Sequence, residues 1–287
     1  MKSALFVPGD SERKLEKAMG SAADALFIDL EDSVAIDAKD DARQIAAAHL
    51  DAAKSGSKLW VRVNAFDTGW TEADLDAVMH GHPAGIVLPK CEHASDVERL
   101  SAILRPLEAQ AGIEDGSTRI IAIITETARG VLNAPSYAEA DLPRLAAVTW
   151  GAEDLSADTG ALRKRDERGR YTDLFRHART TTLLVANACS VQALDTVYPD
   201  FSDAAGFVDE CREARLDGFT GKMAIHPAQV APINEAMMPG PDELTEAQAI
   251  VEAFLETPAA GVLSIGGKMV DRPHLRLAKR TLALAGQ

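Results

Sequence analysis

The stretch V-T-W-G-A-E-D-L, residues 148–155, decides how the fold is interpreted. An apolar run of strand character, residues 145–150, stops at Gly151, and the acids Glu153 and Asp154 follow at once. Carboxylates on the turn after a buried parallel strand are typical of α/β enzymes, whose active sites lie at that end of the sheet. The alternative is a helix start at which the Asp154 side chain caps free N–H groups. Several other strands end in the same way, and this repetition favours an active site.

Short β-branched and apolar runs alternate with longer amphipathic stretches along most of the chain. This alternation indicates βα units around a parallel sheet, and eight runs are the number that a closed (β/α)8 barrel requires. The sequence therefore predicts the α/β class and a TIM barrel. The predicted strands are residues 4–7, 25–30, 58–63, 85–88, 119–125, 145–150, 191–197 and 221–225.

The segments between these runs are predicted to be helices, the first of them starting at Ser11 as the N-cap. Residues 1–240 are expected to form the catalytic barrel and residues 241–287 a helical extension that acts as a lid. Gly266 and Gly267 interrupt the extension as a hinge would. The remaining predicted helices are residues 38–53, 71–79, 94–109, 175–188, 201–216, 241–256 and 273–285.

Composition narrows the possible partners and compartments. The 287 residues carry a formal net charge of −14, and no basic stripe interrupts it, so neither a nucleic acid nor an acidic membrane is an expected partner. The three cysteines are far apart and form no C-x-x-C pair, which indicates reduced thiols rather than disulfides or zinc ligands. No run is long enough for a signal peptide or a membrane span. We therefore expect a soluble, cytoplasmic protein.

Charged and polar residues follow most of the predicted strands, and a barrel would gather them at one mouth. Glu126 and Asp154 follow neighbouring strands, so their carboxylates are expected to converge on one cation of the Mg²⁺ type, which prefers oxygen ligands. Arg62 follows the third strand, and its planar guanidinium suits a substrate carboxylate or a polarised carbonyl. Gly9, after the first strand, allows a ligand to come close to the backbone.

Structural roles compete with these functional ones. Arg62 could form a buried ion pair with Glu31 or Glu126 instead of binding substrate. Asp29 and Asp32 are expected to orient other groups or to cap helices rather than to bind a ligand directly.

Two further residues at strand ends have both a catalytic and a structural interpretation. Lys90 could form a Schiff base, but nothing near it in sequence indicates a lowered pKa, so we expect a salt bridge. His226, before Pro227, is expected to cap a helix or to pack in the core rather than to catalyse. The basic loop R-K-R-D-E-R-G-R, residues 163–170, has no assigned role.

Eight short motifs, spread in order over nearly the whole chain, resemble those of one known family. They are L-F-V-P-G (5–9), D-L-E-D-S-V (29–34), V-R-V-N (61–64), L-P-K (88–90), E-T-A-R-G-V (126–131), G-A-E-D-L (151–155), K-M-A-I-H-P (222–227) and K-M-V-D-R-P-H (268–274). The chain resembles the citrate lyase β-subunit-like family of the HpcH/HpaI aldolase group, which also contains malyl-CoA and citramalyl-CoA lyases.

This resemblance implies a (β/α)8 barrel with Mg²⁺ held by Glu126 and Asp154 and with Arg62 on the substrate. In lyases of the family, the segment that matches residues 268–274 is a lid that reaches the active site of a neighbouring subunit and supplies an essential aspartate, here Asp271. A homotrimer or hexamer is expected for the same reason.

The chemistry of such a lyase assigns the remaining candidate residues. Cleavage of a 3-hydroxyacyl thioester between C2 and C3 expels a thioester enolate, and the C3 alkoxide becomes a carbonyl. Arg62 would stabilise the developing charge, Asp271 would exchange the proton at C2, and backbone N–H groups of residues 151–154 would bind the keto-acid carboxylate. The candidates for substrate contact are Arg62, Pro8, Gly9, Gly151, Ala152 and Glu153.

Coenzyme A carries phosphates, and a small basic cluster at the start of the first helix, Arg13, Lys14 and Lys17, is a candidate to bind them. The alternative is a solvated helix face whose charge is balanced by Glu12 and Glu16.

The leading functional hypothesis is a Mg²⁺-dependent lyase acting on a short 3-hydroxyacyl-CoA of the malyl-CoA or citramalyl-CoA type. The alternatives are a citrate lyase β-subunit that cleaves a carrier-linked citryl group, a malyl-CoA thioesterase, and a non-catalytic acyl-CoA-binding subunit. The paired carboxylates argue against the last of these, because binding alone needs no metal site.

Overall fold

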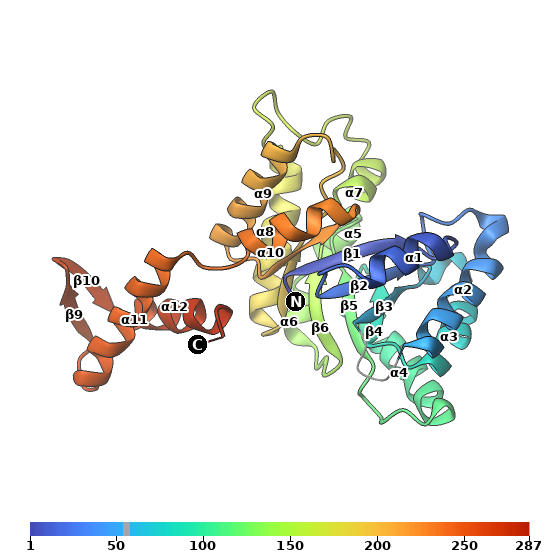
Figure 1. The fold of residues 1–287 in the computed structure, drawn as a ribbon, viewed down its shortest axis with the longest axis horizontal. Helices are drawn as coiled ribbons and strands as arrows, with labels where there is room; N and C mark the ends of the chain where they lie inside the picture. Colours follow the sequence, from blue (N-terminus) through green and yellow to red (C-terminus); the bar gives the residue numbers. More distant parts are fainter. Residues whose placement is uncertain (54–57, 287) are drawn as a thin grey trace. The chain divides into compact units, whose positions relative to one another are not determined.

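The computed structural model describes residues 1–53 and 58–286. The chain divides into two compact units, Met1–Asn234 and Glu235–Gln287. In the first unit the strands form a central barrel that is surrounded by helices (Figure 1).

The first unit is a closed barrel of eight parallel strands that pair in chain order, with β8 returning to pair with β1. This arrangement confirms the predicted (β/α)8 TIM barrel. Several strand ends are one or two residues shorter than predicted, and β1 is one residue longer at each end. The strands are β1 Ser3–Pro8, β2 Ala25–Asp29, β3 Leu59–Arg62, β4 Gly85–Leu88, β5 Arg119–Ile123, β6 Leu145–Thr149, β7 Gln192–Asp195 and β8 Gly221–Ala224.

Apolar side chains fill the interior of the barrel, because alternate residues of each strand point inward. Small residues on β1 and β2 lie beside bulky rings, and the Phe27 and Trp60 ring centroids are 6.3 Å apart. The buried interior cluster takes residues from all eight strands: Ala4, Ala25, Phe27, Trp60, Val87, Ile121, Ile123, Ala147, Leu194 and Met223. The interior of the barrel is therefore a packed apolar core and not a pore.

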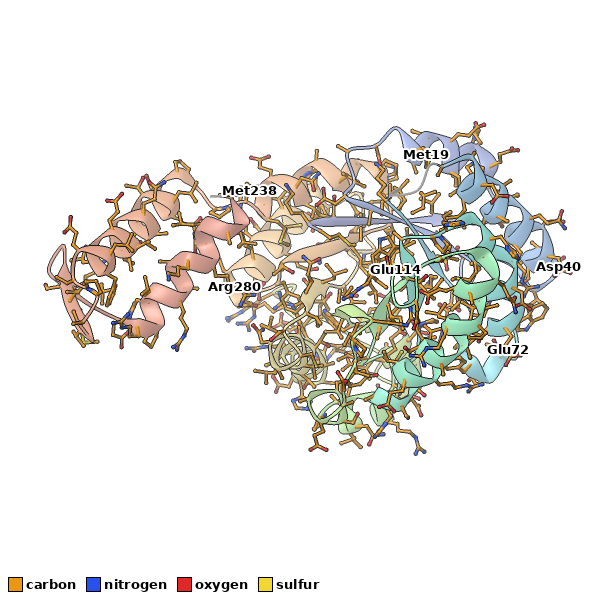
Figure 2. The ribbon with its side chains drawn as sticks, turned by 90° about the horizontal axis from the view of Figure 1, so that it is seen from below. Met19, Asp40, Glu72, Glu114, Met238 and Arg280 are labelled. Atoms are coloured by element: carbon orange, nitrogen blue, oxygen red, sulfur yellow. The ribbon has the colours of Figure 1, made fainter. Side chains whose placement is uncertain are left out.

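Helices cover the outside of the barrel, and Figure 2 shows Met19, Asp40 and Glu72 on the outer helices α1, α2 and α3. The predicted helices are present. Ser11 occupies the N-cap position of α1, but its side chain makes no capping hydrogen bond. The helices are α1 Glu12–Met19, α2 Lys39–Ala52, α3 Thr71–Val78, α4 Ala94–Ala111, α5 Ala128–Asn133, α6 Ser136–Glu139, α7 Ala152–Thr159, α8 Asp173–Ala188, α9 Ala204–Asp217 and α10 Val230–Ala236.

A buried ionic cluster joins the sheet to α8 and α9. Asp195, at the end of β7, lies 3.1 Å from Lys222 Nζ and 3.1 Å from Arg179 Nε. The same carboxylate accepts a 2.7 Å hydrogen bond from Trp150 Nε1. The Asp195 carboxylate is fully buried, and a buried charge is unfavourable unless it is paired and hydrogen-bonded. The two cations and the indole N–H provide these partners. The cluster thereby fixes Trp150, the residue directly before Gly151.

The second unit is a helical pair with a β-hairpin. Helix α11, Pro241–Glu256, is followed by the antiparallel strands β9, Val262–Ile265, and β10, Lys268–Asp271, and by α12, Arg272–Leu284. Phe254, Val270 and Leu275 form its buried apolar cluster. The two helices and the hairpin therefore share one small core.

The interpretation of Gly266 and Gly267 as a hinge is wrong. They are the two-residue turn of the hairpin, with φ of 57° and 79°. Two consecutive positive φ angles are what the common two-residue hairpin turn needs, and glycine supplies them without strain.

Within residues 1–53 and 58–286, none of the helices combines the length and the apolar character that crossing a bilayer requires.

Candidate active site at the barrel mouth

A cavity of about 380 Å³ opens at the carboxyl ends of the barrel strands. It brings together Arg62, Glu126 and Asp154, three residues that the sequence predicts at the mouth of the barrel. Its other lining residues are Phe6, Pro8, Asp29, Asp32, Ser33, Ile123, Gly151, Ala152, Glu153, Thr196, Val197, Met223 and Ile225. All of them belong to the barrel unit.

Glu126 lies three residues beyond β5, and only 3% of its surface is exposed. Its Oε2 atom accepts a 2.6 Å hydrogen bond from the backbone N–H of Lys90. Burial raises the pKa of Glu126 to about 8, with further contributions from the negative charges of Asp154 and Glu31. A cation placed against this carboxylate would remove the conflict between its charge and its burial.

Gly151 gives the Glu126 carboxylate the space that it occupies. A Cβ atom on Gly151 would lie 2.5 Å from Glu126 Oε1 and 2.7 Å from its Cγ. Because real Cβ contacts are longer than this, any other residue at position 151 would displace the Glu126 side chain. Residue 151 of the motif G-A-E-D-L must therefore be glycine, because the carboxylate of Glu126, which follows the neighbouring strand β5, occupies the space of a side chain.

Replacing Gly151 with alanine is expected to weaken Mg²⁺ binding by about 10- to 100-fold, the usual effect of disturbing a group that orients a metal ligand. Isothermal titration with MgCl₂ measures this affinity. Gly20→Ala is the matched control, because its new Cβ would have Lys17 O as its nearest contact at 3.7 Å. An unchanged affinity in Gly151→Ala would contradict the assigned role of Gly151.

Asp154 is the third residue of α7, whose N-cap is Gly151 and whose first turn receives no side-chain cap. The interpretation of Asp154 as a helix cap is therefore wrong. Its side chain is 28% exposed, and Oδ1 lies 3.3 Å from Lys90 Nζ. Asp154 thus presents a partly solvated carboxylate to the cavity beside the buried carboxylate of Glu126.

This pair of carboxylates fits a cation of the Mg²⁺ type. Of the two carboxylate oxygens of Glu126, Oε2 accepts a hydrogen bond, and Oε1 has no hydrogen-bond partner among the residues that the structure describes. No cluster of three or more His, Cys, Asp or Glu suited to a metal occurs in the same described residues. Mg²⁺ commonly uses one or two protein carboxylates and fills its remaining positions with water or substrate oxygens.

Arg62 is held by carboxylates at the end of β2 and beyond it. Its Nε and Nη2 atoms donate to the two oxygens of Asp29, both at 2.7 Å, and Nη1 lies 2.9 Å from Glu31 Oε2. The guanidinium also stands over the Phe6 ring, 4.7 Å from its centroid. The ion pair with Glu31, which was the structural alternative for Arg62, is present, and Asp29 orients a partner as predicted.

These contacts do not use all the donors of Arg62. A guanidinium has five N–H groups. Asp29 accepts hydrogen bonds from two of them, whereas the contact of Nη1 with Glu31 is an ion pair without a hydrogen bond. Donors therefore remain on a side chain that lines the cavity. The ion pairs raise the pKa of Arg62 despite its burial. Arg62 is therefore a fixed, charged donor with capacity for one oxyanion.

Lys90 is salt-bridged, as predicted. Its ammonium pairs with Glu31 and lies 3.3 Å from Asp32 Oδ2 and from Asp154 Oδ1. Although burial alone would lower the pKa of Lys90, these carboxylates raise it above its ordinary value. A lysine in this state has no free amine to form a Schiff base.

The other predicted substrate contacts occupy different positions around the cavity. Pro8 and Ala152 line it. Glu153 also lines it and pairs with Lys164 of the basic loop, which gives that loop a structural contact. Gly9 is packed against the protein's own chain, since its Cβ would lie 2.8 Å from Asp29 O. The need for glycine at position 9 therefore comes from β2 and not from a ligand.

His226 caps a short helical turn, residues 227–229, by accepting a hydrogen bond from Ala228 N–H at 3.2 Å. Its ring stacks on Phe201 with a centroid distance of 5.6 Å. The capping interpretation is confirmed.

The candidate residues for coenzyme A and for the lid lie outside the cavity lining. Arg13, Lys14 and Lys17 are exposed on α1, the helix that follows β1. Asp271 lies in the second unit, where it is the N-cap of α12 and its Oδ1 is 2.5 Å from His274 Nδ1. Hydrogen bonds from His274 lower the pKa of Asp271. Asp271 is therefore held as an ionised carboxylate within its own unit.

A larger cavity, about 670 Å³, lies outside the barrel between residues 165–171, α8 and α9. Its arginines and acids largely neutralise one another, for example Arg165 with Glu210 and Arg179 with Asp217. The smaller cavity at the mouth has the buried carboxylate that lacks a counterion, so its chemistry makes it the candidate active site.

Sequence reasoning missed the apolar side of the site. Phe6, Val197, Met223 and Ile225 line the cavity beside the charged groups. The inward alternation of β1 and β8 was the available signal for Phe6 and Met223.

The family comparison agrees with this geometry. A family model described as HpcH/HpaI aldolase/citrate lyase matches residues 2–227, which include every residue that lines the mouth. The chain belongs to this family.

Similar proteins of the HpcH/HpaI aldolase/citrate lyase family include both lyases and a thioesterase. A (3S)-malyl-CoA thioesterase of Cereibacter sphaeroides is 37% identical over 99% of this chain and 94% of its own length. The citrate lyase subunit beta of Escherichia coli is 36% identical over 99% of this chain and 93% of its own length. The mitochondrial citramalyl-CoA lyase of Homo sapiens is 32% identical over 99% of this chain and 85% of its own length.

A solved structure resembles the whole chain. The protein CitE of Mycobacterium tuberculosis, in complex with magnesium, acetoacetate and coenzyme A, aligns with a TM-score of 0.82 and 33% identity. The alignment covers 100% of this chain and 98% of that one. This chain is thus a member of a family of CoA-ester lyases and thioesterases.

Proposed function

We propose that this chain is a Mg²⁺-dependent carbon–carbon lyase that cleaves a short 3-hydroxyacyl-CoA of the malyl-CoA or citramalyl-CoA type. The products are an acyl-CoA and a 2-keto acid or glyoxylate. The observation that carries the proposal is one cavity in which a pair of carboxylates lies beside an arginine that keeps free donors. Such a cavity suits a substrate with adjacent carboxylate and hydroxyl oxygens.

Glu126 and Asp154 are the residues that would hold Mg²⁺ in this proposal, and the magnesium named for the Mycobacterium tuberculosis relative supports it. Bound Mg²⁺ supplies a Lewis acid and a template for the substrate oxygens. The first turn of α7 has no side-chain cap, so its free N–H groups are available to the keto-acid carboxylate.

Arg62 stabilises the negative charge that develops during cleavage. Because Asp29 and Glu31 hold the guanidinium before substrate arrives, little reorganisation is needed during the reaction. Asp271 exchanges the proton at C2 of the acyl group, and it acts in a neighbouring subunit of a homotrimer or hexamer. Arg13, Lys14 and Lys17 contact the phosphates of coenzyme A.

Hydrolysis of the thioester is the second candidate function. The (3S)-malyl-CoA thioesterase of Cereibacter sphaeroides, at 37% identity, favours it. Both reactions need the same substrate class and the same charged groups, and they differ in whether a carbon–carbon or a carbon–sulfur bond breaks.

Product analysis separates the two reactions. The purified protein is incubated with Mg²⁺ and (3S)-malyl-CoA or citramalyl-CoA, and free CoA, acyl-CoA and keto acid are measured separately. Keto acid or glyoxylate together with acetyl-CoA identifies the lyase. Free CoA together with the intact hydroxy acid, malate or citramalate, identifies the thioesterase, and no turnover of any hydroxyacyl-CoA would contradict both.

Arg62→Lys is expected to lower kcat by about two decades or more, the scale of losing one well-placed donor to a developing oxyanion. Lysine keeps the charge but lacks the planar fork that Asp29 and the substrate share. Steady-state kinetics and a thermal melt measure the two effects separately.

Arg43→Lys is the matched control for Arg62→Lys. Arg43 is also a buried, paired arginine, with Nε 2.8 Å from Asp74 Oδ1, but it lies on α2 outside the cavity lining. This control should lose stability while its kcat stays unchanged. If Arg62→Lys also loses stability while its kcat stays unchanged, Arg62 has only a structural role.

A further inference from the structure

Lys90 contacts both carboxylates of the candidate metal site. Its backbone N–H donates to Glu126 Oε2 at 2.6 Å, and its ammonium lies 3.3 Å from Asp154 Oδ1. The residue sits two positions beyond β4 with φ of 51°, a left-handed conformation that non-glycine residues seldom adopt. This backbone turns the N–H and the side chain of one residue toward the same pair of acids.

The ammonium of Lys90 is shared among several carboxylates. It pairs with Glu31 and lies 3.3 Å from Asp32 Oδ2 as well as from Asp154. Arg62, the other cation of the mouth, makes its ion pairs with Asp29 and Glu31. Within the described residues, Lys90 is therefore the cation that is paired with Asp154.

We propose that Lys90 is a built-in counterion that competes with the divalent cation for Asp154. The proposal rests on the proposed function, because it takes Glu126 and Asp154 as the metal ligands. The ammonium neutralises Asp154 while the site holds no metal. A cation bound between the two acids stands within a few ångströms of that ammonium, so the like charges repel and the metal is bound more weakly than the acids alone would bind it.

The backbone of Lys90 acts in the opposite sense. Its N–H holds Glu126 in the position for the metal, and this contact does not depend on the side chain. Lys90 thus orients one ligand through its main chain and shields the other through its side chain, which keeps the site ordered when empty and the metal exchangeable.

Two variants remove the ammonium and leave the backbone N–H in place. Lys90→Met removes the ammonium and keeps an unbranched side chain of similar length. Lys90→Gly also removes it, and glycine adopts the left-handed backbone without strain, so the N–H bond to Glu126 is retained. Lys58→Met is the matched control, because Lys58 donates to Ser21 O and Ala23 O, outside the cavity lining.

Isothermal titration of MgCl₂ into the full chain without substrate measures the effect. Both Lys90 variants should bind Mg²⁺ about tenfold more tightly or better. Thermal melts should show a larger Mg²⁺-induced rise in Tm for them than for the wild type, since tighter binding stabilises more. Lys58→Met should match the wild type in both measurements.

Whether the Mg²⁺ affinity of the Lys90 variants rises or falls decides between the proposed role of Lys90 and a purely structural one. A lysine that only supports the fold would, when replaced, loosen the acids and weaken Mg²⁺ binding, and an equal or lower affinity in both variants would overturn the proposal. Binding by the variants alone would support it. Absence of binding in all forms would overturn both the metal site and this proposal. If the Lys90 variants bind Mg²⁺ more tightly than the wild type but the protein shows no lyase turnover, the role of Lys90 is supported and only the proposed lyase reaction is contradicted.

Discussion

Glu126→Gln and Asp154→Asn should each lose measurable turnover and lose Mg²⁺ binding, while the metal-free protein keeps its thermal stability. The amide keeps the shape of the side chain but lacks the negative charge that a hard cation requires. Because the pKa of Glu126 is raised to about 8, this carboxyl carries a proton over much of the neutral range in the metal-free protein. Glutamine imitates that protonated form, so folding is little affected.

Titration with MgCl₂, a kinetic assay and a melt in EDTA measure these three quantities. Glu108→Gln is the informative comparison, because Glu108 is also a buried glutamate but is paired with Arg144 at 2.6 Å and 2.7 Å. Breaking that buried pair should cost about 3–5 kcal/mol of stability, yet leave Mg²⁺ affinity unchanged. Near-normal Mg²⁺-dependent activity in Glu126→Gln or Asp154→Asn would show that the carboxylate in question is not a metal ligand.

Asp271→Ala and Arg62→Ala should each be inactive alone and should regain activity when they are unfolded and refolded together. In a mixed oligomer, some sites combine a barrel that retains Arg62 with a neighbouring subunit that retains Asp271. If each active site draws on two subunits and the two variants mix at random in a cyclic trimer, one site in four is complete. The expected recovery is therefore about a quarter of wild-type activity.

Two controls make this complementation decisive. Native mass spectrometry must show that mixed oligomers have formed, and each variant refolded alone must remain inactive. If mixed oligomers form and stay inactive, Asp271 does not act across subunits. If Asp271→Ala alone keeps normal turnover, it is only the N-cap of α12 that the structure shows.

The barrel was predictable because its signals are local. Each strand is a short apolar run, and the acids at the end of β6 stand directly after such a run. The positions of Glu126, Asp154 and Arg62 at one mouth follow from strand order alone, since parallel strands bring their carboxyl ends to the same side.

Contacts between residues that are far apart in sequence were not predictable in the same way. Glu31 bridges Arg62 and Lys90, and only the closed barrel brings these three together. The left-handed backbone of Lys90 leaves no mark in its sequence, because such a conformation normally indicates glycine or asparagine.

Glycines were located correctly but interpreted less well. Gly9 accommodates Asp29 O, Gly151 accommodates Glu126, and Gly266 and Gly267 form a hairpin turn. Gly9 and Gly151 make room for atoms of other segments, whereas Gly266 and Gly267 supply positive φ angles. A single sequence reveals neither which atom will fill the space of a side chain nor which turn a pair of glycines will form.

The way in which Glu126 is held bears on how this family diversifies. Its carboxylate is placed by a backbone N–H of Lys90 and by the missing side chain of Gly151. Substitutions at Val197, Met223 or Ile225, on the apolar side of the cavity, change neither feature. Such substitutions can alter discrimination among acyl groups by about 1–3 kcal/mol for each methylene. Substrate preference can therefore change in small steps while the two candidate metal ligands stay as they are.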